Sequence, residues 1–244
     1  MAVTFDAYGG GTAGGGGTSV ITTQTAYASP ITNAHLTIGA TGTLVLGIFS
    51  AEDATTHAVA TAMTWNGVAM TLITSKASSD NQCAVYVYGL ISPTTGLHTL
   101  SCTYTNGTGG SPVIDLDCCS FRGTDTTSVA ICCPSANVLT DASTCATGPS
   151  NYPTTAFTVT TASGDAVFAA CDANSAFTAN VTIGTLAGHD GASNNNYVSL
   201  YNLAAGSTTQ AQFHVNSGSS PCCGVAFRII QPSAGDVLMA QGCM

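Results

Sequence analysis

The stretch DLDCCSFRGTD, residues 115–125, indicates the fold class because its pattern occurs a second time. It is a short apolar strand that runs into Phe121, Arg122 and a turn, and residues 222–232, CCGVAFRIIQP, repeat that order. Two of the three basic residues of the chain lie in these two stretches, so we interpret them as structural landmarks rather than as a charged surface. The repeat predicts a β-sandwich whose halves end in similar strands.

The composition agrees with a sandwich of short strands. The chain has 244 residues, of which 45% are hydrophobic and only 6% are charged. A disordered chain combines low hydrophobicity with high charge, so this composition indicates a folded protein. All-β sandwiches of this length often form one domain, and we expect a single domain over residues 1–244.

The charge balance excludes two classes of partner. Three basic residues against twelve acidic ones give a formal net charge of -9. A nucleic-acid-binding protein needs clustered Lys and Arg side chains, and an anionic membrane surface attracts the same residues. We therefore expect neither partner. A polar but uncharged surface loses little on being packed against neighbouring subunits, because few charges are desolvated.

No targeting segment is expected. Residues 1–6, MAVTFD, have neither a basic region nor an apolar core of a signal peptide. The most apolar stretch, residues 44–49, is too short to span a bilayer as a helix. We expect a protein that is made in the cytoplasm and leaves the cell, if at all, by lysis.

The eleven cysteines include the adjacent pairs Cys118-Cys119, Cys132-Cys133 and Cys222-Cys223. Adjacent residues of a strand point to opposite faces, which predicts one buried thiol and one outward thiol in each pair that lies in a strand. For most of the cysteines we favour buried free thiols that act as small core residues. No Cys/His group has zinc-site spacing, so we predict no metal. The loop cysteines Cys132, Cys133 and Cys145 are the candidates for a disulfide.

Strand signals recur along most of the chain. The hairpin at 62–73 turns at Asn66-Gly67, a pair that suits the positive φ angles of a type I′ turn. A Gly-rich loop is expected at 9–17 and a long irregular connection at 124–153. A dinucleotide-type glycine pattern lies in the first of these, but no strand-to-helix turn surrounds it, so no cofactor is expected. The remaining expected strands are 43–49, 84–90, 98–104, 113–121, 156–161, 165–171, 181–186, 197–203, 209–215 and 223–230.

Candidate ligand groups are few. Asp115 and Asp117 lie two apart on a strand and so on one face, where they would bind calcium or act as acid and base, or simply line a solvated face. We favour the solvated face, with Ile114, Leu116 and Cys118 pointing inward. The polar loop 188–196 lacks the spacing of a calcium loop and is interpreted as a turn, and the five histidines are scattered.

No catalytic signature is present, and we predict that the protein is not an enzyme. The single Trp, Trp65, borders the hairpin turn. An indole there either stacks on a sugar or packs against its cross-strand neighbour, and the second alternative is favoured.

Several short sequence motifs together resemble a known domain. They are the Leu-Val-Leu-Gly strand at 44–47, the Asn-Gly hairpin, VYVYGLISPTTG at 85–96, SFRGTDTT at 120–127, SGDAVF at 163–168 and VAFR at 225–228. In this order they resemble a β-sandwich domain of tailed-phage virion proteins and of some large bacterial surface proteins. The cysteine pairs and the near absence of lysine depart from that pattern. The resemblance implies a jelly-roll-like module for display, attachment or particle reinforcement.

The resemblance and the charge balance lead to one main expectation. The chain is expected to be an all-β, single jelly-roll-like antiparallel sandwich that acts as a capsid decoration or cement protein of a phage-like virion. It would assemble as a homo-oligomer on the major capsid protein or other virion subunits, with residues 9–17 and 124–153 ordering on a neighbour. The alternatives are a carbohydrate-binding or adhesin module that uses Trp65, and a lattice- or filament-forming surface protein.

Overall fold

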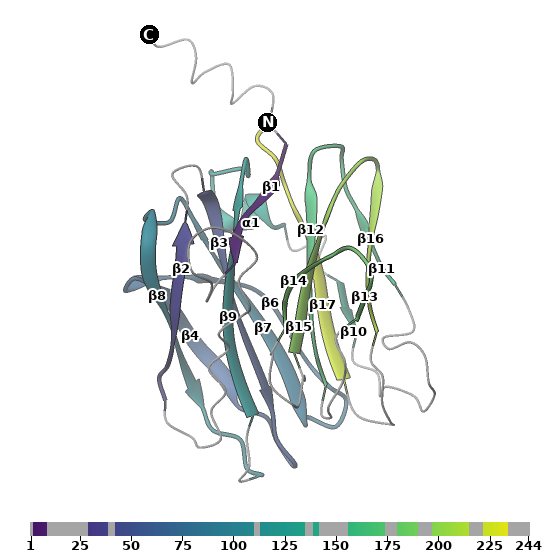
Figure 1. Ribbon diagram of the computed structural model, residues 1–244. Helices are drawn as coiled ribbons and strands as arrows, with labels where there is room; N and C mark the ends of the chain where they lie inside the picture. Colours follow the sequence, from purple (N-terminus) through teal and green to yellow (C-terminus); the bar gives the residue numbers. More distant parts are fainter. Residues whose placement is uncertain are drawn as a thin grey trace.

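The computed structural model describes residues 2–8, 29–38, 42–109, 113–134, 139–141, 156–173, 180–189, 197–214 and 222–233. Most of these residues lie in antiparallel strands, and the sheets stack as four layers (Figure 1). The Gly-rich stretch 9–17 lies outside the described residues. The prediction of an all-β antiparallel sandwich is confirmed.

The first half of the chain forms two sheets. The first inner sheet has the strand order β1-β9-β3-β7-β6, and the first outer sheet has the order β2-β8-β4-β5. The strands are β1 Thr4–Tyr8, β2 Ile31–Ile38, β3 Gly42–Glu52, β4 Val59–Trp65, β5 Val68–Ala69, β6 Thr71–Ala77, β7 Cys83–Ile91, β8 Gly96–Thr105 and β9 Val113–Arg122.

The second half repeats this arrangement. The second inner sheet has the order β10-β17-β12-β15-β14, and the second outer sheet has the order β11-β16-β13. The strands are β10 Leu139–Asp141, β11 Phe157–Thr160, β12 Ala166–Ala173, β13 Asn180–Ile183, β14 Thr185–His189, β15 Tyr197–Leu203, β16 Thr208–His214 and β17 Cys222–Ile229.

Both halves have the strand order of a jelly roll. We number the strands of each half from 1 to 8 in chain order. In each inner sheet strand 1 pairs with strand 8, strand 8 with strand 3, and strand 3 with strand 6. In the first half, β5 and β6 count as one strand that crosses from the outer to the inner sheet at Met70. Eight strands in two antiparallel sheets of this order make a jelly roll. The sequence predicted a single jelly-roll-like sandwich, whereas the structure contains the motif twice, once in each half of the chain.

The repeated Phe-Arg pattern marks equivalent strands in the two jelly rolls. Its first copy lies in β9 and its second in β17, which are the last strands of the two halves. The prediction of two halves that end in similar strands is therefore confirmed. The Asn66-Gly67 turn is also present, with φ of 49° and 78°, and it joins β4 to β5 at the Trp65–Val68 pair.

Three apolar cores hold the layers together. One core lies inside each jelly roll, between its inner and its outer sheet. The third lies between the two inner sheets and includes Phe121 of the first half and Phe168 and Phe227 of the second. The inner sheets consequently have two buried faces, and each outer sheet has one face away from the core. Figure 1 shows the first outer sheet at the left edge and the second at the right edge.

The connection at 124–153 is less irregular than predicted. It contains a short helix, α1, at Val129–Cys132, which Ser128 caps by accepting a hydrogen bond from the Ile131 N–H at 3.2 Å. It also contains β10, which pairs with β17 through three residues. Sequence patterns gave no signal for either element, because both are short and depend on contacts with distant strands.

The prediction of one outward thiol in each strand pair is wrong for Cys118-Cys119. Cys118 lies in the core of the first jelly roll and Cys119 in the core between the inner sheets, and both are buried. The same holds for Cys222 and Cys223, which lie in two different cores. The physical reason is that an inner strand has no solvent-facing side.

Candidate functional site

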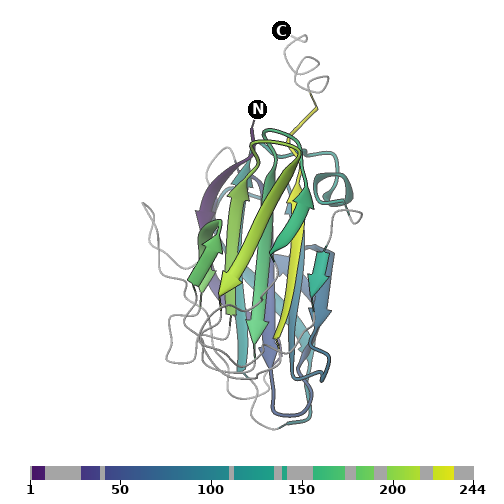
Figure 2. The same cartoon turned by 90° about the vertical axis from the view of Figure 1, so that its right-hand side faces the viewer.

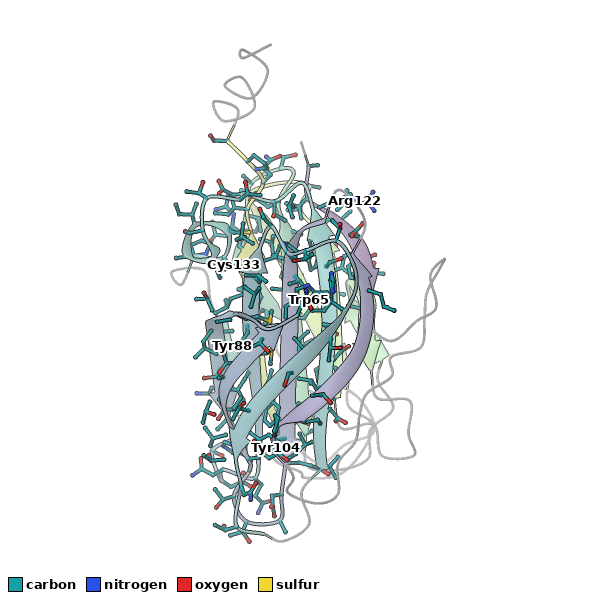
Figure 3. The ribbon with its side chains drawn as sticks, turned by 90° about the vertical axis from the view of Figure 1, so that its left-hand side faces the viewer. Trp65, Tyr88, Tyr104, Arg122 and Cys133 are labelled. Carbon is teal, nitrogen blue, oxygen red and sulfur yellow. The ribbon has the colours of Figure 1, made fainter. Side chains whose placement is uncertain are left out.

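Trp65 lies inside the first jelly roll. Its side chain has 0% exposure, and its ring meets the His98 ring edge to face with the centroids 5.9 Å apart. The register places it opposite Leu100 of β8 (Figure 3). The indole therefore presents no face on which a sugar could stack, and the packing alternative describes its position.

The two members of the proposed disulfide loop that the structure describes are thiols in the interior. Cys132 ends α1 and Cys133 follows it, and both are buried. Burial, followed by a hydrogen bond with Cys132, raises the pKa of the Cys133 thiol. Cys145 lies outside the described residues, so a disulfide in this loop stays a prediction.

The prediction that Asp115 and Asp117 line a solvated face is wrong. Their exposed fractions are 2% and 3%, because this face of β9 is covered by the second inner sheet. The expectation that Ile114, Leu116 and Cys118 point inward is correct, since they lie in the core on the opposite side of β9. Tyr197 Oη of the second jelly roll donates a hydrogen bond to Asp117 Oδ2 at 3.1 Å.

These carboxylates belong to a polar end of the interface between the inner sheets. We define this end by Glu52, Cys83, Asp115, Asp117, Asp172, Tyr197 and Cys223. The first four come from the first jelly roll, and Asp172 pairs with both Cys223 and Tyr197 in the second. The other end of the same interface is apolar and contains the phenylalanine cluster.

Asp172 is a strongly perturbed carboxyl of the polar end. Burial raises its pKa well above the ordinary 3.8, and the neighbouring Cys83, Glu52 and Asp115 add to the effect. The Ala173 N–H opposes it by donating a hydrogen bond to the carboxylate. Within the described part of the chain, Asp172 Oδ2 has no hydrogen-bond partner. These features favour a neutral, protonated Asp172 inside the protein.

The described residues contain no group of three or more His, Cys, Asp or Glu side chains arranged to hold a metal ion. His57 and His98 each have one ring nitrogen within hydrogen-bonding distance of a backbone carbonyl. The side chains of His35, His189 and His214 fall outside the described part, as do residues 190–196 of the polar loop.

The outer sheets differ from the inner ones in charge. All seven strands of the two outer sheets lack Asp, Glu, Lys and Arg, whereas charged residues occur in seven of the inner strands. The exposed side chains of the outer strands include Thr99, Thr103 and Thr105 of the first outer sheet. Those of the second outer sheet, which faces the viewer in Figure 2, include Thr158, Thr208 and Gln210.

The sequence analysis did not predict that acidic side chains are buried between the two inner sheets. A signal was present, because Glu52, Asp115, Asp117 and Asp172 interrupt strands that are otherwise apolar on both faces. Near-continuous apolar runs are typical of strands that are covered on both sides. Acidic residues within strands that are apolar on both faces therefore indicate a buried polar cluster rather than a solvated face.

No protein-family model matches this chain, and no curated protein or solved structure matches it either. Among the described residues, no helix has the length and apolar character needed to cross a membrane.

Proposed function

We propose that this protein is a non-enzymatic structural subunit of a phage-like virion, which decorates and reinforces the capsid as a homo-oligomer. Its partners are the major capsid protein and further copies of itself, and the contacts are made by the faces of the two outer sheets. The observation that carries this proposal is the absence of charged residues from the seven outer strands.

An uncharged face suits a protein that is packed against neighbours. Burying a charge in an interface costs several kcal/mol unless it is paired, whereas threonine faces lose only hydrogen bonds to water that the partner can replace. At about 25 cal/mol per Å² of apolar surface, an interface of ordinary size holds a subunit without a catalytic residue.

The four-layer arrangement supports the same role. The two uncharged sheets lie on opposite sides of the molecule (Figure 1), so one subunit has a face for each of two neighbours. The inner sheets, with their shared core, keep these faces at a fixed separation. A cementing protein needs both properties, because it connects parts of a lattice.

Immunogold labelling of particles from the source culture tests the proposal. Regular label on the particle heads is the expected result, with mass spectrometry of the purified fraction as confirmation. Digestion needs a protease other than trypsin, because the chain has only three cleavage sites. Label at the tail tips would favour the adhesin alternative, and absence of label from every particle would overturn the virion proposal.

Charge insertion then tests the contact faces. Thr103→Lys and Thr208→Lys place a cation on the exposed face of the first and the second outer sheet, respectively. Each is expected to weaken binding to particle heads by tenfold or more while the melting temperature stays unchanged. Thr126→Lys, at an exposed loop position, is the matched control and should bind like the parent protein.

A further inference from the structure

The polar end of the inner-sheet interface brings two thiols from different jelly rolls together. Cys83 is the first residue of β7, and Cys223 is the second residue of β17. Their Sγ atoms lie 3.8 Å apart, although 140 positions separate them in the sequence. Both residues are buried.

The surroundings hold both side chains in this position. The Cys83 N–H donates a hydrogen bond to Ser78 Oγ at 3.1 Å, and its Sγ is 3.7 Å from the Asp172 carbonyl oxygen. Cys223 lies directly opposite Asp172 in the register of β12 and β17. Asp172 therefore fixes the two thiols relative to each other across the interface.

We infer that Cys83 and Cys223 form a cross-linking site whose oxidation joins the two jelly rolls by a disulfide. A disulfide bond is about 2 Å long, and rotation of the two side chains toward each other covers the remaining gap. Because the bond would connect the first inner sheet to the second, it would tie together the halves that the central core already holds.

The oxidant is a small-molecule disulfide such as oxidised glutathione. One cysteine thiolate attacks a sulfur of this molecule, its S–S bond breaks, and one glutathione leaves as a thiol with the proton that the cysteine lost. The second cysteine then attacks the mixed disulfide and releases the second glutathione. The two protein thiols are oxidised to one disulfide, and one glutathione disulfide is reduced to two thiols.

Burial decides when this exchange takes place. It raises the pKa of the Cys223 thiol well above its ordinary value, with further contributions from Cys83 and Asp172. Because the thiolate is the nucleophile, the closed interface reacts slowly, and exchange proceeds while the inner sheets are apart. In a reducing compartment the thiols persist, and folding in an oxidising medium closes the bond.

Refolding of the full chain tests the inference. The denatured, reduced protein is refolded with a mixture of reduced and oxidised glutathione, alkylated, and digested with pepsin for mass spectrometry. A peptide pair linked through Cys83 and Cys223 is the expected product, with a melting temperature several degrees above that of the reduced protein. Alkylated Cys83 and Cys223 in refolded protein, or linkage of either to another cysteine, would overturn the inference.

Variants separate this bond from other disulfides. Cys83→Ser and Cys223→Ser should each abolish the rise in melting temperature on oxidation, whereas Cys102→Ser should retain it, because Cys102 lies in the first outer sheet. A rise that survives in either of the first two variants would contradict the inference. If a variant does not fold, the alkylation pattern of the parent protein still decides. None of these measurements depends on the virion proposal.

Discussion

At the scale of single residues, small side chains determine how closely the sheets approach. Gly47 lies in β3, and a Cβ atom built there would be 2.2 Å from Met63 Sδ and 3.0 Å from Leu100 Cδ1. Both neighbours are buried side chains of the first outer sheet. Glycine at this position therefore lets the inner and outer sheets of the first jelly roll pack face to face.

Gly47→Ala is expected to destabilise the protein by about 1–3 kcal/mol, because the added methyl group overpacks this core. The measurement is equilibrium unfolding in urea. Gly206→Ala is the control, since a Cβ at Gly206 meets no atom within 4 Å, and it should change the free energy of unfolding by less than about 0.5 kcal/mol. Equal effects of the two variants would show that the close approach at Gly47 is irrelevant to stability.

Asp172 gives the protein a pH dependence with a definite sign. The pKa of Asp172 in the folded protein is raised above the ordinary 3.8. At pH values between 3.8 and the raised pKa, the folded state therefore binds the proton more tightly than the unfolded state does. The corresponding stability is fully present below about pH 4 and decreases as the pH rises toward the raised pKa, by at most about 1.4 kcal/mol per pH unit.

Asp172→Asn is therefore expected to lose this dependence, because the amide is uncharged at every pH. The gain in stability of Asp172→Asn over the parent protein should grow in urea titrations as the pH rises from about 4 toward the raised pKa of Asp172. The Asp172→Asn variant keeps all the titratable groups that surround position 172 on the neighbouring strands. These are Glu52, Cys83, Asp115, Asp117, Tyr197 and Cys223. Asp80→Asn, at an exposed turn, is the control, and a parallel pH profile for both variants would contradict the assignment.

At the scale of elements, the two copies of the Phe-Arg pattern end equivalent strands but differ in burial. Arg228 Nε is 2.6 Å from Asp165 Oδ2, and the exposed fraction of the Asp165 side chain is 0%. Asp165 also accepts hydrogen bonds from the backbone N–H groups of Ala162 and Gln231. It thereby attaches the end of β17 to the turn before β12. Arg122 pairs with Asp6 of β1, and its side chain is 45% exposed.

Arg228→Met should consequently cost more than Arg122→Met. Removing the Arg228 guanidinium leaves a buried carboxylate without its cation, and we expect a loss of about 2–4 kcal/mol, lowered from the fully buried case because Arg228 is partly exposed. Arg122→Met is the matched variant, and its partner Asp6 is also buried, with 2% of the side chain exposed. The Arg122 cation is 45% exposed against 20% for Arg228, so water screens its pair more strongly, and we expect a smaller loss of about 1–2 kcal/mol. Chemical denaturation compares the two, and equal losses would show that burial of the pair does not matter.

At the scale of the whole molecule, the shared core makes the two jelly rolls one structure. The cluster between the inner sheets takes side chains from both halves, and Phe5 of β1 stacks on Tyr201 of β15 with the ring centroids 4.4 Å apart. The backbone also crosses between the halves, since the Val3 N–H donates to the Gly164 carbonyl at 2.7 Å. Either half alone would expose the apolar face of its inner sheet.

The described fold is therefore expected to unfold in one cooperative transition. Scanning calorimetry of the reduced protein should give a calorimetric enthalpy equal to the van't Hoff enthalpy. The reductant is needed so that no disulfide joins the two halves during the scan. Two resolved transitions would show that the jelly rolls are independent domains and that the central core contributes little.

The sequence by itself determined the fold class, most of the strands, the Asn66-Gly67 turn and the equivalence of the two Phe-Arg strands. These features depend on local patterns, namely alternation, turn residues and a repeated phrase, which act between residues close together in the chain. Only the tertiary structure decided that Asp115 and Asp117 are buried, that Cys83 meets Cys223, and that the outer sheets are the uncharged ones. The physical reason is that each of these depends on which face of a strand is covered, and the cover comes from strands far away in the sequence.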